Sequence, residues 1–417
     1  MRIGFLFNHD QIHQVAHGLP IALALATMRS GAEIIVCVTN ERLAEEVRRL
    51  APGSAGRDFE LVQLGLTKPA SRSFDRLAHA FIPSAKLLMY KDNLDFFKHL
   101  DVLVVPEMTS LILKTRFGLD QLKIIHTRHG AGDRAIGFNR ASASFDHVLV
   151  SGPKIRQRLI ADAGVDPARI SVVGYPKFDL CAASRSAHPL IDTGRPVVVY
   201  NPHVSPHLSS WYQIGRHILD WFAEHDEYQL IFAPHVMLFE RPVAVTIDKF
   251  AIGFPGSIDK RHLRAANIHV DLGSRNSTTM AYLNRADIYL GDVSSQIYEY
   301  LIRPRPCVFL NSHRFDWQKD ANFAMWTAGP VIERASALGP ALADAQARHQ
   351  STYAPIQQRL FEESFDLTDT PSSIRAAAVV AEIAGVKPKT VRSAPVRTPS
   401  GRRTSAAAIS EDQRGNA

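Results

Sequence analysis

Two hydroxyls and one carboxylate follow directly after an apolar run in the second half of the chain. The run Ile288–Leu290 stops at Gly291 and Asp292, Ser294 and Ser295 come next, and helical apolar periodicity begins after them. Backbone N–H groups at a helix start bind anions, and serine side chains can add donors. The alternative is a simple helix cap, which Asp and Ser commonly form. We predict that Gly291, Asp292, Ser294 and Ser295 bind the phosphate of a donor.

Histidines stand after other predicted strands in the same way. His129 follows the apolar run Leu122–Ile125 and precedes Gly130, and glycine lets a ligand approach the backbone closely. A histidine placed there can act as a general base because its unperturbed pKa is about 6.5. The alternative is that His129 holds a turn. His203 and His235 end two later strands, where a role in a cleft or in a turn is open.

Charged residues near these turns are further candidates for a cleft. Asp133 and Arg134 can orient His129 or an acceptor, or they form an ordinary ion pair in a loop. Lys177 ends the segment Gly174–Lys177, which lines the hinge of a cleft or is simply a proline turn.

Motifs for a metal or a cofactor do not stand out. His203 and His207 are four residues apart, but the prolines around them disfavour a helix and no third ligand is evident. The chain has neither a P-loop nor the glycine-rich fingerprint of nicotinamide enzymes. We therefore predict no metal and no cofactor.

The elements that must position these side chains alternate between strand and helix. Short apolar β runs separated by helices indicate parallel, doubly wound sheets. In the first half, strands are predicted at Ile3–Phe7, Glu33–Val38, Glu60–Leu64, Val102–Val105, Lys123–His126, His147–Val150 and Ile170–Val173. In the second half, they are predicted at Val197–Tyr200, Gln229–Phe232, Ile268–Val270, Ile288–Leu290 and Cys307–Leu310. Helices are predicted at Gln14–Arg29, Glu41–Leu50 and Lys154–Ala163.

A segment rich in Ser, Ala, Pro and Gly separates the two halves. We expect an N-terminal Rossmann-like acceptor domain at 1–181, a linker at 182–196, a C-terminal Rossmann-like nucleotide-donor domain at 197–385 and a disordered basic tail at 386–417. Two such domains in succession predict an α/β protein of the GT-B type, with its active site in the cleft between them. A last helix over Ser372–Ile383 would cross back to the first domain.

Composition limits the functions that the chain can have. The net charge is +7, but residues 387–417 hold seven basic and two acidic residues, so the body carries only about +2. This is too little for a nucleic-acid-binding core. There is no run of about 18 apolar residues for a membrane span and no signal peptide. Three separated cysteines fit a reducing compartment. We expect a cytoplasmic protein, with peripheral contact to the inner face of the membrane as an open question.

Basic and aromatic residues alternate between Lys68 and Lys98. Such a pattern suits a helix that lies on an anionic membrane surface. The alternative, which we favour, is a helix pair that packs its apolar side chains into the first domain.

The candidate turns together resemble one protein family. Asp292–Leu301, followed by Arg305–Asn311, is similar to the D-Y-S-S, F-D-Y-L and K-P-I signature of the CDP-glycerol glycerophosphotransferase (teichoic acid polymerase-like) family. His129-Gly130 resembles its W-H-G segment, and Ile170–Asp179 resembles its G-Y-P-R-x-D segment. The motifs keep the family's order over roughly residues 100–330.

The chain also departs from this family. Arg128 replaces the family's tryptophan, Ala131 and Gly132 replace threonine and proline, and Val293 replaces tyrosine. The R-x-H-P segment appears only as Ala233-Pro-His-Val. These departures concern the donor and the acceptor more than the fold.

The resemblance implies a GT-B transferase that moves a glycerophosphate-like group from a CDP-activated donor to a hydroxyl of a cell-envelope glycan or lipid-linked acceptor. It implies that His129 takes the proton of that hydroxyl, while His235 and the Asp292–Ser295 turn hold the donor pyrophosphate. One alternative is a GT-B glycosyltransferase or a sugar-nucleotide 2-epimerase that uses a UDP-sugar. Another is a non-catalytic protein that binds sugar phosphates.

Overall fold

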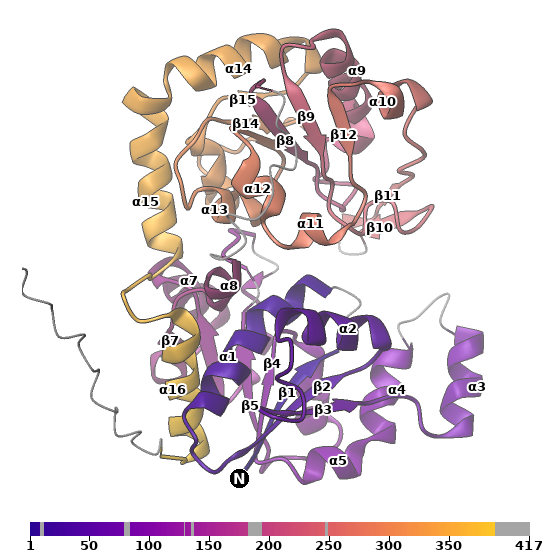
Figure 1. Ribbon diagram of the computed structural model, residues 1–417, viewed down its shortest axis with the longest axis vertical. Helices are drawn as coiled ribbons and strands as arrows, with labels where there is room; N and C mark the ends of the chain where they lie inside the picture. The colour runs from indigo at the N-terminus through magenta and orange to yellow at the C-terminus, as the bar shows by residue number, and fades with distance from the viewer. Residues whose placement is uncertain are drawn as a thin grey trace, which may run out of the picture.

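The computed structural model describes residues 1–8, 12–78, 84–128, 130–134, 137–181, 194–246 and 249–387. It contains two large parallel sheets, one in each half of the chain, with helices packed against them (Figure 1). The predicted doubly wound α/β organisation is therefore confirmed. Most of the predicted linker and nearly all of the predicted tail lie outside the described residues.

The first sheet has seven parallel strands in the order β3-β2-β1-β4-β5-β6-β7. They are β1 (Arg2–Phe7), β2 (Glu33–Val38), β3 (Glu60–Gln63), β4 (Val102–Val105), β5 (Lys123–Thr127), β6 (His147–Val150) and β7 (Ile170–Val172). Each was predicted as a strand, because a strand that is covered on both faces is apolar along most of its length.

The helices of the first half are α1 (Val15–Thr27), α2 (Glu41–Leu50), α3 (Pro69–Ala78), α4 (Ser84–Asp92), α5 (Leu94–Lys98), α6 (Ile112–Thr115), α7 (Pro153–Ala163) and α8 (Pro176–Cys181). The described residues of the basic and aromatic segment form α3, α4 and α5. Tyr90 and Phe97 from this segment are fully buried in the first domain. At these two positions the packed helices, rather than a membrane-facing surface, account for the aromatic residues.

The second sheet has six parallel strands in the order β12-β9-β8-β13-β14-β15. They are β8 (Val197–Asn201), β9 (Gln229–Phe232), β12 (Ile268–Val270), β13 (Ile288–Gly291), β14 (Cys307–Leu310) and β15 (Val331–Ile332). A separate antiparallel pair is formed by β10 (Ala244–Thr246) and β11 (Ala251–Gly253). The helices are α9 (Arg216–Glu224), α10 (Lys260–Arg264), α11 (Arg275–Thr278), α12 (Ala281–Arg285), α13 (Gln296–Tyr300), α14 (Leu338–Ala347) and α15 (Ala354–Ser364).

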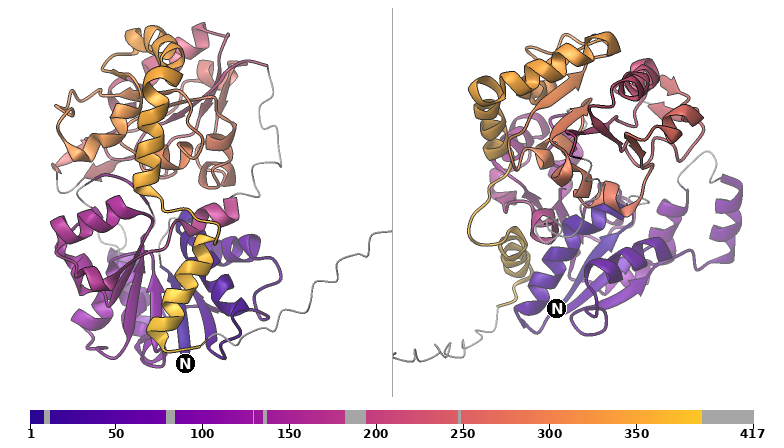
Figure 2. Two further views of the ribbon diagram at one scale, coloured as in Figure 1. Left: turned by 90° about the vertical axis from the view of Figure 1, so that its left-hand side faces the viewer. Right: turned by 45° about the horizontal axis from the view of Figure 1, so that its top comes forward.

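The chain returns to the first domain at its end. After α15 it continues into α16 (Ser372–Ala384), which lies against the first sheet (Figure 2). Alanines and Val380 of α16 join the core around α1, and the Asp179 carboxylate accepts the N–H of Ser373 at 2.7 Å. The sequence analysis set the end of the second domain at residue 385 and expected a last helix over Ser372–Ile383 to cross back to the first domain, and α16 does pack there.

Among the described residues, none of the helices combines the length and the apolarity that crossing a bilayer requires.

Candidate functional site

A cavity of about 580 Å³ lies between the two domains, where the carboxyl ends of strands from both sheets face each other. Ligands of open α/β sheets bind at this end of the strands. The side chains that line the cavity include five histidines, two arginines and two serines, namely His13, His17, His126, His203, His235, Arg128, Arg134, Ser294 and Ser295.

Two histidines of the second domain are fixed as hydrogen-bond donors. His203 Nδ1 accepts the N–H of Ser205 at 2.9 Å, and His235 Nδ1 accepts the N–H of Met237 at 3.3 Å. Each neutral ring therefore carries its proton on Nε2. Burial and, to a smaller extent, the charge of Arg134 together lower the pKa of His203 well below its ordinary value and that of His235 to about 4. Both rings are neutral at pH 7.

Basic side chains outnumber acidic ones among the described residues that line the cavity. Three acids in its wall are each paired with a lysine, Glu107 with Lys86 at 3.0 Å, Asp133 with Lys154 at 2.7 Å and Glu299 with Lys177 at 2.7 Å. Arg128 and Arg134 line the cavity as well, so its described lining holds four basic and three acidic side chains. A cavity with this charge favours an anionic ligand.

The turn after β13, which was predicted to bind phosphate, has some residues in the cavity wall and others in the core. Ser294 and Ser295 line the cavity, and the Ser294 hydroxyl accepts the N–H of Gln296 at 3.2 Å. Gly291 is buried, and a Cβ there would lie 2.6 Å from the Tyr289 hydroxyl. Because α13 has five residues, its dipole is small. The serine hydroxyls and the N–H groups of the turn are the donors that this segment offers to an anion.

Asp292 lies behind the cavity wall. Its side chain is completely buried, and its Oδ2 accepts the N–H of His203 at 2.8 Å. Burial raises the pKa of Asp292 to about 7, against the opposite effect of Ser210 and the His203 amide. In this position the carboxylate supports the turn that carries His203 and, unlike Ser294 and Ser295, it does not line the cavity in which the sequence analysis expected it to bind a phosphate.

Glycines bring a loop of the first domain onto the start of α13. Gly130 and Gly132 line the cavity, and a Cβ on Gly132 would lie 3.2 Å from the Cβ of Ser295. His129, the predicted base, lies outside the described residues. Its chain neighbours Arg128 and Gly130 both line the cavity.

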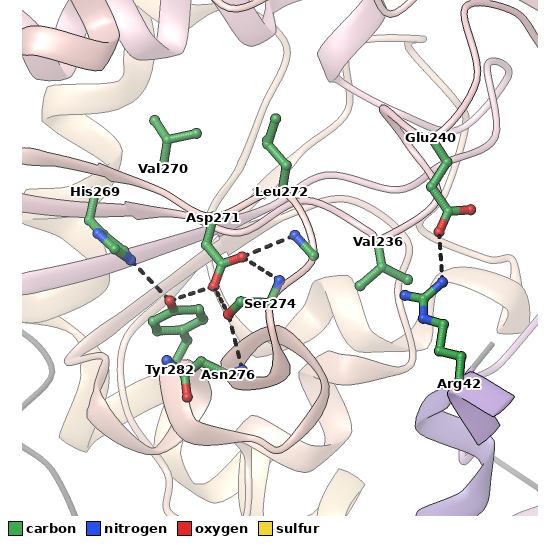
Figure 3. A pocket seen from close by; sticks show the side chains of 11 residues that line it. Arg42, Val236, Glu240, His269, Val270, Asp271, Leu272, Ser274, Asn276 and Tyr282 are labelled. Carbon is green, nitrogen blue, oxygen red and sulfur yellow. Dashed lines mark hydrogen bonds and ion pairs between the residues drawn. The ribbon is translucent and has the colours of Figure 1, made fainter. Parts of the chain in front are cut away.

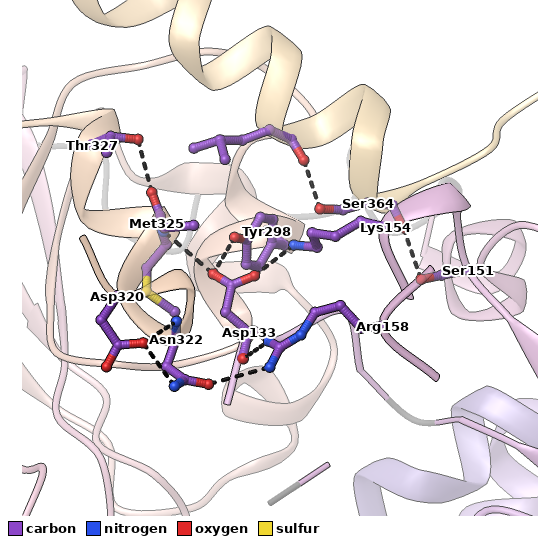
Figure 4. A network of polar contacts seen from close by, with 12 residues as sticks. Asp133, Ser151, Lys154, Arg158, Tyr298, Asp320, Asn322, Met325, Thr327 and Ser364 are labelled. Atoms are coloured by element: carbon purple, nitrogen blue, oxygen red, sulfur yellow. Dashed lines mark hydrogen bonds and ion pairs between the residues drawn. The ribbon is translucent and has the colours of Figure 1, made fainter. Parts of the chain in front are cut away.

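Asp133 joins the two domains (Figure 4). Its carboxylate accepts from Lys154 Nζ at 2.7 Å, from the Tyr298 hydroxyl, and from the N–H of Met325 at 3.3 Å. Tyr298 and Met325 belong to the second domain. Burial raises the pKa of Tyr298 well above its ordinary value, so its phenol stays protonated and donates. Through these contacts Asp133 connects the first domain to the second.

Lys177 forms a second bridge between the domains. Its Nζ donates to both carboxylate oxygens of Glu299, at 2.8 and 2.7 Å, and the Tyr175 hydroxyl donates to the same carboxylate at 2.7 Å. Glu299 follows Tyr298 in α13, so consecutive residues of this helix hold the first domain. Lys177 also lines the cavity, as one of the two readings in the sequence analysis expected of a cleft residue.

Solved structures share this arrangement of two domains. No protein-family model and no curated protein matches the chain. The wall teichoic acid polymerase TagF is similar with a TM-score of 0.61 at 15% identity, over 92% of this chain and 89% of that one. The UDP-GlcNAc 2-epimerase from Neisseria meningitidis, solved bound to UDP-GlcNAc, is similar with a TM-score of 0.55 at 15% identity, over 92% of this chain and 99% of that one. The fold is of the GT-B type, as predicted.

Three histidines of the GT-B cleft were not recognised as lining residues. The motifs of the sequence did not single out His13 and His17, but both line the cavity, and His17 is 2% exposed. The His13 ring centre lies 6.5 Å from that of His235. His126 lines the cavity and stacks on Phe145 at 4.6 Å. His13 and His17 follow β1, whose carboxyl end lies at this edge, and that position is the signal that could have found them.

A second cavity of about 550 Å³ adjoins the first, since Val236 lines both (Figure 3). Asp271, at the end of β12, accepts the N–H of Ser274 at 2.7 Å and the Tyr282 hydroxyl at 2.5 Å. Burial acts to raise the pKa of Asp271, but the hydroxyls of Ser274 and Tyr282 outweigh it and lower the pKa to about 2. Asp271 is therefore an ionised anchor in the wall of this cavity.

Within the described ranges, no three His, Cys, Asp or Glu side chains gather as ligands for a metal ion.

Proposed function

We propose that the protein is a GT-B transferase acting on a nucleotide-activated donor. It would move a polyol-phosphate group, with CDP-glycerol as the first candidate donor, to a hydroxyl of a cell-envelope glycan or lipid-linked acceptor. The observation that carries this proposal is the convergence of Arg134, His203, His235, Ser294 and Ser295 on one positively charged cavity. These side chains offer charged and neutral hydrogen-bond donors, which suit the oxygens of a pyrophosphate.

In the proposed reaction, the acceptor oxygen attacks the phosphorus of the polyol phosphate while the bond from phosphorus to the leaving nucleotide breaks. The acceptor proton passes to His129, the base that the sequence suggests. The Nε2–H groups of His203 and His235 donate to the phosphate oxygens of the leaving nucleotide. Arg134 offsets the negative charge that develops there.

We assign the nucleoside part of the donor to the second cavity. It adjoins the first at Val236, and its volume of about 550 Å³ lies within the range of small-molecule sites. The reacting phosphates would then lie between Arg134 and the serine turn.

A UDP-sugar is the second candidate substrate. It is favoured by the likeness to the Neisseria meningitidis UDP-GlcNAc 2-epimerase, which was solved with UDP-GlcNAc bound. The same cleft would then act at the sugar instead of at phosphorus.

The test is incubation of the purified protein with CDP-glycerol or UDP-GlcNAc, followed by chromatography of the nucleotides. Release of CMP in the presence of an acceptor supports the first proposal. Release of UDP, or formation of an epimer, supports the second. Binding of a donor without turnover would indicate a non-catalytic binding protein.

Matched variants locate the phosphate site. Arg134→Gln and His235→Ala should weaken the binding of CDP-glycerol. Arg359→Gln and His217→Ala serve as controls, because these side chains are 65% and 72% exposed and do not line either cavity. If Arg134→Gln binds the donor as tightly as its control does, the cavity is not the phosphate site.

A further inference from the structure

The ribbon of β10 and β11 turns large apolar side chains towards solvent. Val245 and Ile252 are partners across the two strands and are 59% and 63% exposed. Phe250 and Phe254 are 93% and 71% exposed. With Val243, these residues form a patch that we call the apolar ribbon. It contains five of the ten exposed large hydrophobic side chains in the described part of the chain.

The opposite face of the ribbon is small or polar and is packed on the second domain. A Cβ on Gly253 would lie 2.6 Å from the Tyr212 ring, and the Thr246 hydroxyl bonds to that of Ser205. Beyond β11, Trp211 Nε1 donates to the carbonyl oxygen of Pro255 at 2.9 Å. A strand on a protein surface usually turns its apolar residues inward. In this ribbon the apolar side chains face solvent instead, and the contacts of the opposite face hold the ribbon in that orientation.

We infer that the apolar ribbon inserts into the interfacial layer of an anionic membrane. Arg241 and Lys249 flank it, and both are exposed. Residues 240–264 carry five basic and three acidic side chains. Apolar rings beside cations are what an anionic lipid surface binds, because the rings enter the acyl boundary while the cations meet the headgroups.

The size of the patch favours lipid over a second copy of the chain. From typical side-chain areas, the five residues expose on the order of 600 Å². A stable protein interface needs about 800 Å² from each partner. Phe250 and Phe254 are also its most exposed side chains, at 93% and 71%, and side chains this exposed can enter a soft surface more easily than they can pack on a flat protein face.

The position of the ribbon is consistent with a membrane beside the cleft. It lies on the same side of the molecule as α3 and α4, which carry the exposed Arg72 and Lys91 (Figure 1). A membrane on this side would bring a lipid-linked acceptor to the cleft of the proposed transferase. The inference extends the proposed function, but membrane binding can be measured without turnover.

The test is flotation of the full-length protein with vesicles of phosphatidylcholine, either alone or mixed with phosphatidylglycerol. We expect binding to the mixed vesicles. The double variant Phe250→Ser/Phe254→Ser should lower the partition coefficient by about 100-fold, which is roughly tenfold for each ring. Lys249→Gln should lower binding to the mixed vesicles about fivefold and leave binding to phosphatidylcholine unchanged. Leu367→Ser is the control, because Leu367 is 44% exposed and is not part of the ribbon.

Three results would overturn the inference. The first is that the parent protein does not float with the mixed vesicles. The second is that the double variant floats like the Leu367→Ser control, since the basic tail or α3 and α4 would then carry the binding. The third is a lipid-free dimer of the parent that becomes a monomer in the double variant, which would make the ribbon a contact between copies. Turnover of a soluble acceptor should be the same in the double variant and the parent, so failure of the proposed chemistry is recognised separately.

Discussion

Replacing Lys177 with methionine removes one charge of a buried ion pair and keeps most of the side-chain volume. The side chains of Lys177 and Glu299 are 6% and 7% exposed. In the variant, the Glu299 carboxylate keeps the hydroxyl of Tyr175 as a neutral donor but loses both bonds from the ammonium. Removing one partner of a buried pair costs about 3–5 kcal/mol of stability. We expect a loss of about 3 kcal/mol, because the Tyr175 bond remains.

Urea unfolding of a double-mutant cycle measures this contribution. Glu299→Gln should also be destabilising, since it leaves a buried ammonium. The double variant Lys177→Met/Glu299→Gln should lose less than the sum of the single variants, because it buries no unpaired charge. Lys98→Met is the control, since its pair with Asp95 is 55% and 89% exposed, and it should unfold like the parent. If Lys177→Met unfolds like this control, the Glu299 carboxylate reaches water in solution and the cleft is more open than described.

Further variants test the cavity. His235→Ala should weaken CDP-glycerol binding about 10- to 150-fold by calorimetry, since a hydrogen bond to a charged phosphate is worth about 1.5–3 kcal/mol. Because the folded pKa of His235 is about 4, below its ordinary 6.5, the parent should lose about 3 kcal/mol of stability as the pH falls from 6.5 to 4, and His235→Gln should lack this part of the loss in urea titrations. Asp292 has a folded pKa of about 7, above its ordinary 3.8, so the parent loses stability as the pH rises through this window. Asp292→Asn should lack that loss, so it should match the parent at low pH and be more stable than the parent at pH 8; a variant clearly less stable than the parent at pH 8 would contradict this reasoning. Gly132→Val should lower donor affinity with little change in melting temperature, because its side chain would push the loop away from Ser295.

The strands were predictable because their signal is local. Strands covered on both faces are short apolar runs between polar turns, and the predicted runs match both sheets except β15. That strand has two residues, which is too short for a pattern. The β10–β11 pair was missed for a different reason. Its apolar residues point outward, so the sequence rule for half-buried strands does not indicate where it packs.

The residues that line the cavity were predictable where they directly follow the end of a strand. His203, His235, Ser294 and Ser295 were found in this way, and all line the cavity. The roles of the acids were not predictable, because their partners are distant in sequence. Asp292 binds a residue 89 positions away, and Asp133 binds Tyr298 165 positions away. A carboxylate beside a turn has the same local pattern whether it faces a ligand or a partner in the core.

Arg134 lines the cavity together with His203 and His235 but comes from the other domain. The resemblance expects an arginine two residues before His235, but Ala233 stands there and is 4% exposed within the core of the second domain. Positive charge reaches His203 and His235 from Arg134 instead, which lies in the first domain. Arginine and histidines therefore belong to opposite walls, and their donors converge only while the domains are close together. A phosphate bound between these walls would contact both domains at once, so its binding energy would favour the closed arrangement that Asp133 and Lys177 already stabilise.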